Sequence, residues 1–175
     1  MACLGSVTAP DFAERFIGTA VSEYKGLEII VNNAGYTWDN VIQKMTDEPW
    51  YAMIDCHLTA PFRILRAAQP VIRAFSKTEA EAGQRVVRKV VNISSIAGLF
   101  GNAGQANYST AKAGIVGMTQ TLAKEWGRMN VTVNCVLGRG GTPEEAAGAV
   151  YLLCIPESGY VSGQTLMCSG GLTAI

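Results

Sequence analysis

Residues 86–95 read VVRKVVNISS, a run rich in β-branched residues that ends in two hydroxyl side chains. Such a run predicts a buried strand of a parallel sheet. A loop with Gly98, Gly101 and Gly104 follows it, and from Gln105 to Arg128 apolar residues recur every three or four positions, which predicts a helix. A buried strand that leads through a glycine-containing loop into a long helix is the repeating unit of an α/β fold.

The same alternation of strand and helix continues on both sides of this unit. Further strands are expected at Leu27–Val31, Val131–Val136 and Gln164–Met167. Further helices are expected between Pro10 and Tyr24, over residues 47–76 with bends or boundaries at Pro61 and Pro70, and after the capping box Thr142-Pro143-Glu144-Glu145. The polar residues 76–89 are expected to form a solvated helix end and a surface turn. We therefore expect one α/β domain over residues 1–175, a parallel sheet with helices on both faces.

The composition excludes several classes of protein. The chain has 175 residues, 49% of them hydrophobic and 16% charged, which suits a globular domain and not a disordered chain. Fourteen basic and fourteen acidic residues leave a net charge of +0, so neither nucleic acid nor a membrane is an expected partner. The five cysteines are widely spaced and we interpret them as buried thiols; with no secretory signal pattern, we expect a cytoplasmic location. A single histidine and the absence of clustered cysteines predict no metal site.

Three side chains near the quoted strand point to proton-transfer chemistry. Tyr108 and Lys112 are four residues apart on the predicted helix, so they leave the same face about one turn apart. A phenol has a pKa of about 10, and a cation nearby lowers it by about 1–3, which would make Tyr108 a usable general acid or base. Ser95 ends the strand, where α/β sheets bind ligands, and its hydroxyl could donate to a substrate oxygen. Taken alone, Tyr108 and Lys112 would be an ordinary pair on a helix surface, and Ser95 would be an ordinary turn residue. Their combination favours a catalytic site.

These residues lie in a longer pattern that resembles a known family. Val91–Gly114 (VNISSIAGLFGNAGQANYSTAKAG), together with NNAG at residues 32–35, resembles the short-chain dehydrogenase/reductase family. Its part GNAGQANYSTAKAG is similar to the 3-oxoacyl-(acyl-carrier-protein) reductases within that family. The resemblance covers nearly the whole chain and implies a three-layer Rossmann-like fold, NAD or NADP as the cofactor, and interconversion of a ketone, with a 3-oxoacyl thioester as the most similar class, and a secondary alcohol.

The resemblance also implies a role for each matching residue. Tyr108 would pass a proton to or from the substrate oxygen, Ser95 would polarise that oxygen, and Lys112 would lower the pKa of Tyr108 and bind the nicotinamide ribose. Asn92 would tie neighbouring strand ends together. The residues that would shape the cofactor side of the cleft are Asn33, Ala34 and Gly35.

One residue of the pattern departs from the family. In MIDCHLTAPF, His57 stands where the family usually has an asparagine that holds a proton-relay water. Imidazole can both donate and accept, so His57 could serve in a relay. The alternative is a helix histidine whose ring is satisfied by a nearby carbonyl, and we give the two interpretations equal weight.

Two segments of the family pattern have no counterpart in the chain. The family opens with a strand and a glycine-rich turn that binds pyrophosphate, whereas Ser6-Val7-Thr8 resembles the end of its third strand, so the fold is expected to be incomplete at the amino terminus. In NCVLGRGGTPEE, Cys135-Val136 and Gly138-Arg139 resemble two ends brought together where the family has a substrate lid. Either segments of a longer protein are not represented, which we favour because mobile binding segments are the ones missing, or the chain is truncated.

Two functions therefore remain open. The first is an NAD(P)-dependent oxidoreductase, and the second is a non-catalytic or truncated oligomerisation partner that cannot bind dinucleotide. The sequence does not separate NAD from NADP, because the residue that reads the ribose 2′ position would lie in the missing part. The family commonly pairs two long helices, so we expect a homodimer or homotetramer. Apolar residues of these helices, shared between core and interface, are Phe62, Leu65, Ile115 and Met118.

Overall fold

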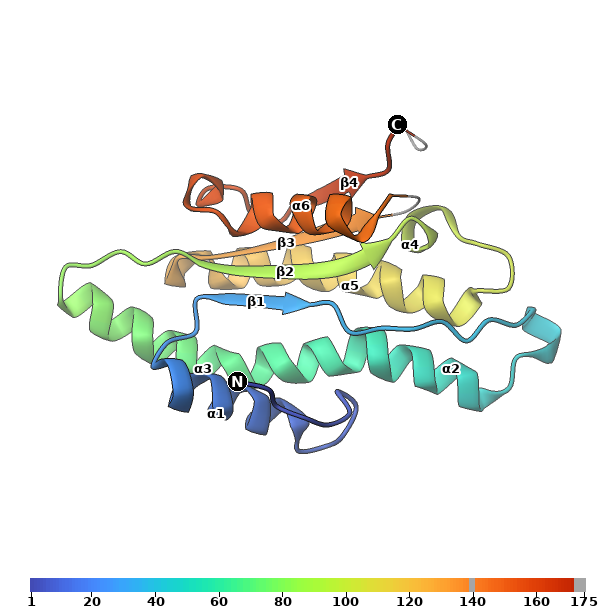
Figure 1. Ribbon diagram of the computed structural model, residues 1–175, viewed down its shortest axis with the longest axis horizontal. Coiled ribbons are helices and arrows are strands. Elements are labelled where there is room, and N and C mark those ends of the chain that lie inside the picture. Colours follow the sequence, from blue (N-terminus) through green and yellow to red (C-terminus); the bar gives the residue numbers. More distant parts are fainter. Residues whose placement is uncertain (139–140, 172–175) are drawn as a thin grey trace.

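A sheet of four parallel strands forms the centre of the computed structural model, which describes residues 1–138 and 141–171 (Figure 1). The strands lie in the order β1-β2-β3-β4, and each pairs in parallel with the next. Their bounds are Ile29–Asn32 (β1), Arg88–Ser95 (β2), Val131–Gly138 (β3) and Thr165–Cys168 (β4). The predicted fold class is confirmed, and the predicted strands lie within a few residues of the observed ones.

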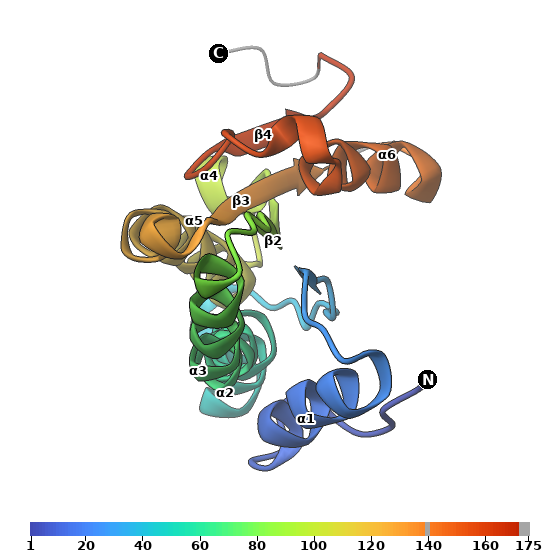
Figure 2. The same ribbon diagram turned by 90° about the vertical axis from the view of Figure 1, so that its left-hand side faces the viewer.

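Helices cover both faces of this sheet. Their bounds are Phe12–Tyr24 (α1), Asp47–Ile54 (α2), Ala60–Glu81 (α3), Ala97–Phe100 (α4), Ala106–Trp126 (α5) and Pro143–Cys154 (α6). Helices α1, α3 and α5 pack on one face, and α6 packs on the other (Figure 2). The result is the three-layer Rossmann-like arrangement.

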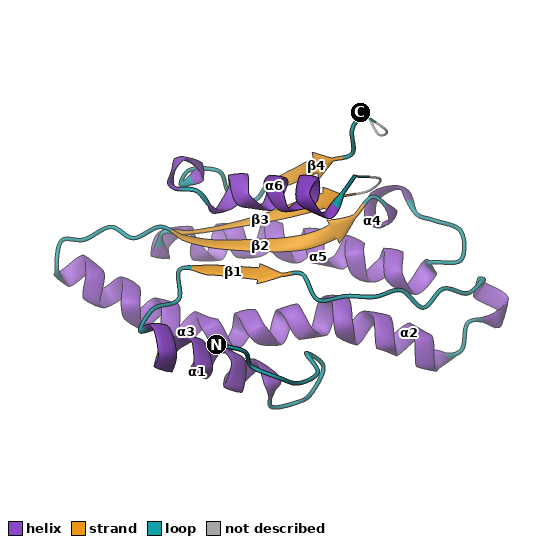
Figure 3. Ribbon diagram, viewed as in Figure 1, coloured by secondary structure: helices purple, strands orange, loops and turns teal. Residues whose placement is uncertain are grey.

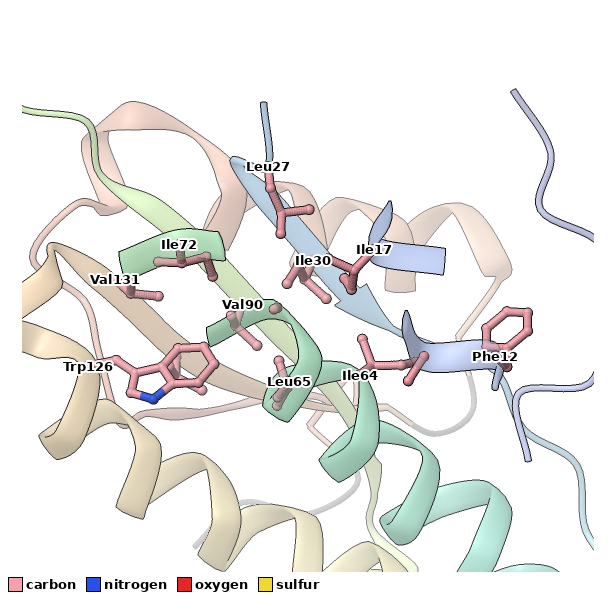
Figure 4. Packing of buried hydrophobic residues seen from close by; sticks show 13 residues of the cluster. Phe12, Ile17, Leu27, Ile30, Ile64, Leu65, Ile72, Val90, Trp126 and Val131 are labelled. Carbon is pink, nitrogen blue, oxygen red and sulfur yellow. The ribbon is translucent and has the colours of Figure 1, made fainter. Parts of the chain in front are cut away.

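The main hydrophobic core lies between the sheet and the α1, α3 and α5 layer (Figure 4). Ile30 of β1 and Val90 of β2 pack there with Leu65 of α3. On the opposite face, Val91 of β2 packs with Leu153 of α6. Neighbouring residues of β2 point to opposite faces, and because both faces are covered, Val90 and Val91 at its centre are both buried and apolar.

One long helical run extends below the sheet and above α1 in Figure 3. It consists of α2, a π-helical turn η2 (Asp55–Thr59) and α3. Pro61 lies in the first turn of α3, where the missing N–H costs nothing, so the boundary predicted there is confirmed. Pro70 lies inside α3 and does not end it.

The expectation of a solvated turn over residues 76–89 is wrong at its far end. Helix α3 continues to Glu81, and Arg88 and Lys89 are buried at the start of β2. The guanidinium of Arg88 donates to both carboxylate oxygens of Glu79, at 2.8 and 2.6 Å. The ammonium of Lys89 donates to Ser158 Oγ at 3.1 Å. These partners, distant in sequence, make burial of the two cations tolerable.

Strand β3 runs on beyond its predicted end. It reaches Gly138, which pairs with Ser95 of β2. The chain is therefore a regular strand as far as Gly138, the point where two ends of the family pattern were expected to meet. Residues 139–140, including Arg139, lie outside the described residues. Immediately afterwards the predicted capping box is present: Thr142 Oγ1 accepts from Glu145 N, and the Glu145 carboxylate accepts from Thr142 N at 2.7 Å.

The thiols are free but not uniformly buried. Cys56 and Cys135 are buried as predicted, whereas Cys3, Cys154 and Cys168 are only partly buried. Within the described ranges, no helix combines the length and hydrophobicity of a transmembrane segment. The same ranges bring no three His, Cys, Asp or Glu side chains together as a metal-ligand group.

The four apolar residues considered for a helix interface separate into two groups. Leu65 and Ile115 belong to the core of the monomer and are not available to a partner. Met118 is partly buried beside the core, and Phe62 of α3 is exposed. The Arg66 guanidinium lies 5.1 Å from the centre of the Phe62 ring.

Candidate active site

The predicted site residues gather around the carboxyl ends of β1 and β2 and the first turns of α5. Asn92, fully buried in β2, joins these elements as predicted. Its Oδ1 accepts from Asn32 Nδ2 of β1 at 2.8 Å, and its Nδ2 donates to Thr119 Oγ1 of α5 at 2.9 Å. These two hydrogen bonds fix the positions of β1, β2 and the helix that carries Tyr108 relative to one another.

Lys112 is the cation of the site, and the fold buries it to 5% exposure. Its Nζ donates to Ile93 O at 2.6 Å and lies 5.6 Å from the centre of the Tyr108 ring, so Tyr108 and Lys112 share one face of α5 as predicted. Burial lowers the pKa of Lys112 from 10.5 to about 8, against smaller opposing effects of Cys135 and Cys56. Lys112 is therefore still protonated near neutral pH.

The surroundings of Lys112 leave its charge without an anionic partner. Burial raises the pKa of Cys135 to about 11, and burial also raises the pKa of Cys56, so both thiols are neutral near pH 7. Across residues 1–138 and 141–171, no carboxylate forms an ion pair with Lys112. The ammonium can therefore act on Tyr108 and on a ligand.

Two backbone contacts fix where Lys112 lies. Ser94 Oγ donates to the carbonyl of Lys112 at 2.7 Å, which joins β2 to α5. A Cβ at Gly98 would come within 2.7 Å of the Lys112 carbonyl carbon, so α4 and α5 approach more closely than any other residue at position 98 permits. Sequence analysis predicted Gly98 only as part of a flexible loop; its packing role depends on a helix that lies next to it only in the folded chain.

Of the two serines that end β2, Ser95 is the one with a hydrogen to spare. The hydroxyl of Ser94 is used by Lys112, as described. Ser95 Oγ accepts from Ala97 N at 3.2 Å in the turn toward α4. Ser95 therefore does stabilise the turn, as one of its two interpretations predicted. Because its oxygen only accepts in this bond, the hydroxyl hydrogen is free to donate to another acceptor.

His57 lies in η2 with 3% of its surface exposed, and its ring meets the Tyr108 ring edge to face at 5.0 Å. Its Nε2 lies 2.7 Å from Tyr36 O; because a carbonyl only accepts, Nε2 carries the hydrogen. Nδ1 is buried without a hydrogen-bond partner. Burial first, and then the charge of Lys112, lowers the pKa of His57, while the bond to Tyr36 acts in the opposite direction. The ring is therefore neutral near pH 7, with Nδ1 unprotonated and without a partner.

The NNAG residues after β1 divide between two tasks. Asn33 and Ala34 are exposed and line a cavity of about 170 Å³ together with Val7. Gly35 instead backs onto His57: a Cβ there would overlap the imidazole. Asn33 and Ala34 thus border a cavity, while glycine at position 35, which is also exposed, makes room for the histidine.

Sequence analysis missed one buried polar residue of the site, Asn107. It is fully buried and bonds to the backbone of Trp38, Pro49 and Tyr108. The signal available was an amide directly before Tyr108 in an otherwise small and apolar helix start, but its partners are far away in the sequence.

The chain is similar in sequence to several known proteins. Residues 1–142 match a family model described as short chain dehydrogenase. Among curated proteins, the 3-oxoacyl-[acyl-carrier-protein] reductase of Vibrio cholerae is 35% identical over 97% of this chain and 76% of its own length. Those of Chlamydia muridarum and Synechocystis are 35% and 34% identical over 97% and 98% of the chain, each over 75% of its own length. The Vibrio cholerae alignment spans 196 residues, 21 more than the 175 of this chain, so the relative has residues inside the matched range that this chain lacks.

Proposed function

Because the chain belongs to the short-chain dehydrogenase family, whose members are oxidoreductases, we propose that it interconverts a ketone and a secondary alcohol with NAD or NADP. The names of its relatives support a 3-oxoacyl thioester as the ketone. The observation that carries the proposal is the buried Lys112 ammonium, which has no carboxylate partner among the described residues and lies 5.6 Å from the Tyr108 ring centre.

The proposed division of labour follows from what each side chain can donate. Tyr108 gives its phenolic proton to the ketone oxygen as the carbon receives hydride, and takes it back in the reverse direction. Ser95 donates its free hydroxyl hydrogen to the same oxygen and so polarises the carbonyl. Lys112 stabilises the negative charge that remains on Tyr108 after the transfer.

The residues present fit one end of the dinucleotide. Beyond its bond to Ile93 O, the Lys112 ammonium has hydrogens left for a ribose hydroxyl, and Asn33 borders, with Ile93 and Gly138, a cavity of about 470 Å³ at the carboxyl ends of β1, β2 and β3. When bound, the cofactor supplies or accepts the hydride. Among the described residues, the glycines that precede a helix, Gly98, Gly101 and Gly104, lie in the segment before Tyr108, and no separate glycine-rich turn for the pyrophosphate follows β1.

We further propose that His57 takes the place of the family's asparagine in a proton relay. Its ring contacts the Tyr108 ring and lies within the electrostatic influence of Lys112. Its Nδ1 is a buried acceptor without a partner, which suits a water that donates to Nδ1 and accepts from the ammonium. The Tyr36 carbonyl fixes the ring so that this nitrogen stays unprotonated. Turnover that is unchanged in His57→Leu would contradict the relay.

A direct assay tests the proposed reaction. NADH or NADPH oxidation would be followed with a 3-oxoacyl thioester, and Tyr108→Phe should abolish it because the phenyl ring keeps the packing but has no proton to give. Equal rates for the wild type and Tyr108→Phe would overturn the proposed chemistry.

The second candidate is a non-catalytic oligomerisation partner, and the observation that favours it is that residues 1–138 and 141–171 hold no separate pyrophosphate-binding turn. Titration with NADH and NADPH, followed by nicotinamide fluorescence, separates the two functions. A saturable signal that is lost in Lys112→Met supports the enzyme, whereas no saturable signal with either nucleotide supports the non-catalytic protein.

A further inference from the structure

Asn107 occupies the second position of α5, directly before Tyr108, and is completely buried. Its Nδ2 donates to two carbonyl oxygens, Trp38 O at 3.1 Å and Pro49 O at 2.9 Å. Its Oδ1 accepts from Tyr108 N at 2.8 Å. Both amide hydrogens and the amide oxygen are thus engaged, so the side chain has one orientation, with the oxygen toward α5 and the nitrogen toward the two carbonyls.

Helix α5 depends on this amide because its N-cap residue does not supply a cap. The first N–H groups of a helix have no partner within it, and Gln105 at the N-cap makes no capping bond. Its side chain donates instead to Asp39 Oδ2 at 2.7 Å and accepts from Asn102. The Tyr108 N–H is therefore satisfied by Asn107, from inside the first turn.

The other two partners of Asn107, the carbonyls of Trp38 and Pro49, belong to segments outside α5. Trp38 belongs to residues 36–40, here called the strap, which leave β1 and cross toward α5 (Figure 3). The strap is bound at both ends: Tyr36 O accepts from His57 of η2, and Asn40 N donates to Gly104 O at 2.8 Å. Asn107 binds its middle, at Trp38 O.

The second carbonyl, that of Pro49, belongs to α2, which continues directly into η2 with His57. One amide thus connects three elements at a single point, namely the helix of Tyr108, the strap, and the helical run that carries His57. The Asn107 side chain accepts its hydrogen bond from the backbone N–H of Tyr108. A shift of the strap or of α2 would therefore move the start of α5.

We propose that Asn107 is a positioning residue for the oxidoreductase reaction: it fixes Tyr108 against the strap and against the helical run that bears His57. This inference rests on the proposed function. Asn107 would act by positioning other groups and not by contacting the substrate. Its side-chain amide is bonded to three backbone groups and has no hydrogen left to donate to a substrate.

Asn107→Asp is the sharpest variant, because it keeps the oxygen that accepts from Tyr108 N and removes both donations, leaving oxygen against two carbonyls. Asn102→Asp is the matched control, since it makes the same change at an exposed amide four residues before α5 begins. We expect kcat of Asn107→Asp to fall about 10²-fold, the loss that follows a displacement of about 1 Å, with little change in KM for the nucleotide. The solvent isotope effect on kcat should rise, since proton transfer becomes slower, and Asn102→Asp should behave as the wild type.

A second variant and an activity-independent measurement keep the inference testable. Asn107→Ser adds no charge and still offers an oxygen, so it should lose less kcat than Asn107→Asp. In the protein without nucleotide, hydrogen exchange at the amides of Tyr108 and Asn40 should accelerate together in both variants, because the strap and α5 come apart.

The outcomes separate this inference from the proposed function. Wild-type kcat in both Asn107 variants, a loss confined to KM, or failure of both to fold would overturn the positioning role. If the wild type shows no nucleotide-dependent turnover but the two amides still lose protection together, the proposed reaction fails while the coupling through Asn107 stands.

Discussion

At the scale of single residues, Lys112 shows how the fold stores electrostatic free energy at the site. An ammonium that is buried against a carbonyl and neutral thiols has lost most of its hydration and has no anion to replace it. Such a charge is useful if it acts on Tyr108 and on the nucleotide, as the proposed function requires. The cost should be visible as a pH dependence of folding.

We predict that the free energy of unfolding rises between about pH 8 and 10.5 through Lys112. The folded pKa is about 8 and the ordinary value 10.5, so in this window the unfolded chain binds the extra proton, and stability increases with pH; below pH 8 both states are protonated and the cost is constant. The full difference is roughly 3 kcal/mol. Urea unfolding at several pH values should show this rise in the wild type and not in Lys112→Met. Parallel curves for the two proteins would contradict it.

At the scale of elements, the crossing of α4 and α5 decides where Lys112 lies. We predict that Gly98→Ala destabilises the protein by about 1–3 kcal/mol, because its methyl group would press on the backbone of Lys112. Gly117→Ala on the exposed side of α5 is the control: its Cβ meets nothing, and alanine favours a helix by about 0.5–1 kcal/mol. Thermal unfolding of both variants measures the difference, and equal effects would contradict the close approach.

A second prediction concerns the ion pair that joins α3 to β2. Removing Glu79 leaves Arg88 buried and uncompensated, so Glu79→Ala should cost about 3–5 kcal/mol, whereas Glu81→Ala, which breaks an exposed pair with Lys77, should cost less than about 1 kcal/mol. Hydrogen bonds from Arg88 hold the pKa of Glu79 below 4.5. Its contribution is therefore complete above pH 4.5 and lost as the pH falls below it. Acid unfolding curves that coincide for the wild type and Glu79→Ala would refute this.

The strands and helices could be predicted because their signals are local. β-Branched runs gave β2 and β3, and the capping box at Thr142 gave the start of α6. In the site, the spacing of Tyr108 and Lys112 was enough to place them on one face. The rest depends on contacts between distant segments: the burial of Arg88, and the bonds of Asn107, exist only once the chain has folded.

At the scale of the whole molecule, association with a second copy stays a prediction. Two of the residues first considered for it are core residues, which leaves Phe62 on α3 as the exposed aromatic of that set. We predict a dimer or larger species in sedimentation velocity at micromolar concentration, weakened by Phe62→Glu. Glu28→Gln, a change at an exposed side chain on β1's side of the molecule, should sediment as the wild type. A monomer at all concentrations would contradict the prediction.

The position of β1 at the rim of the sheet also has a consequence for handling the protein. Among the described strands, β1 pairs on one side only, and its Ile29 and Val31 side chains are exposed, 49% and 42% respectively. An open row of peptide groups flanked by apolar side chains is a template for unwanted strand pairing. In concentrated solution this border should be where aggregation starts, and preparations of the isolated chain will keep best when they are dilute.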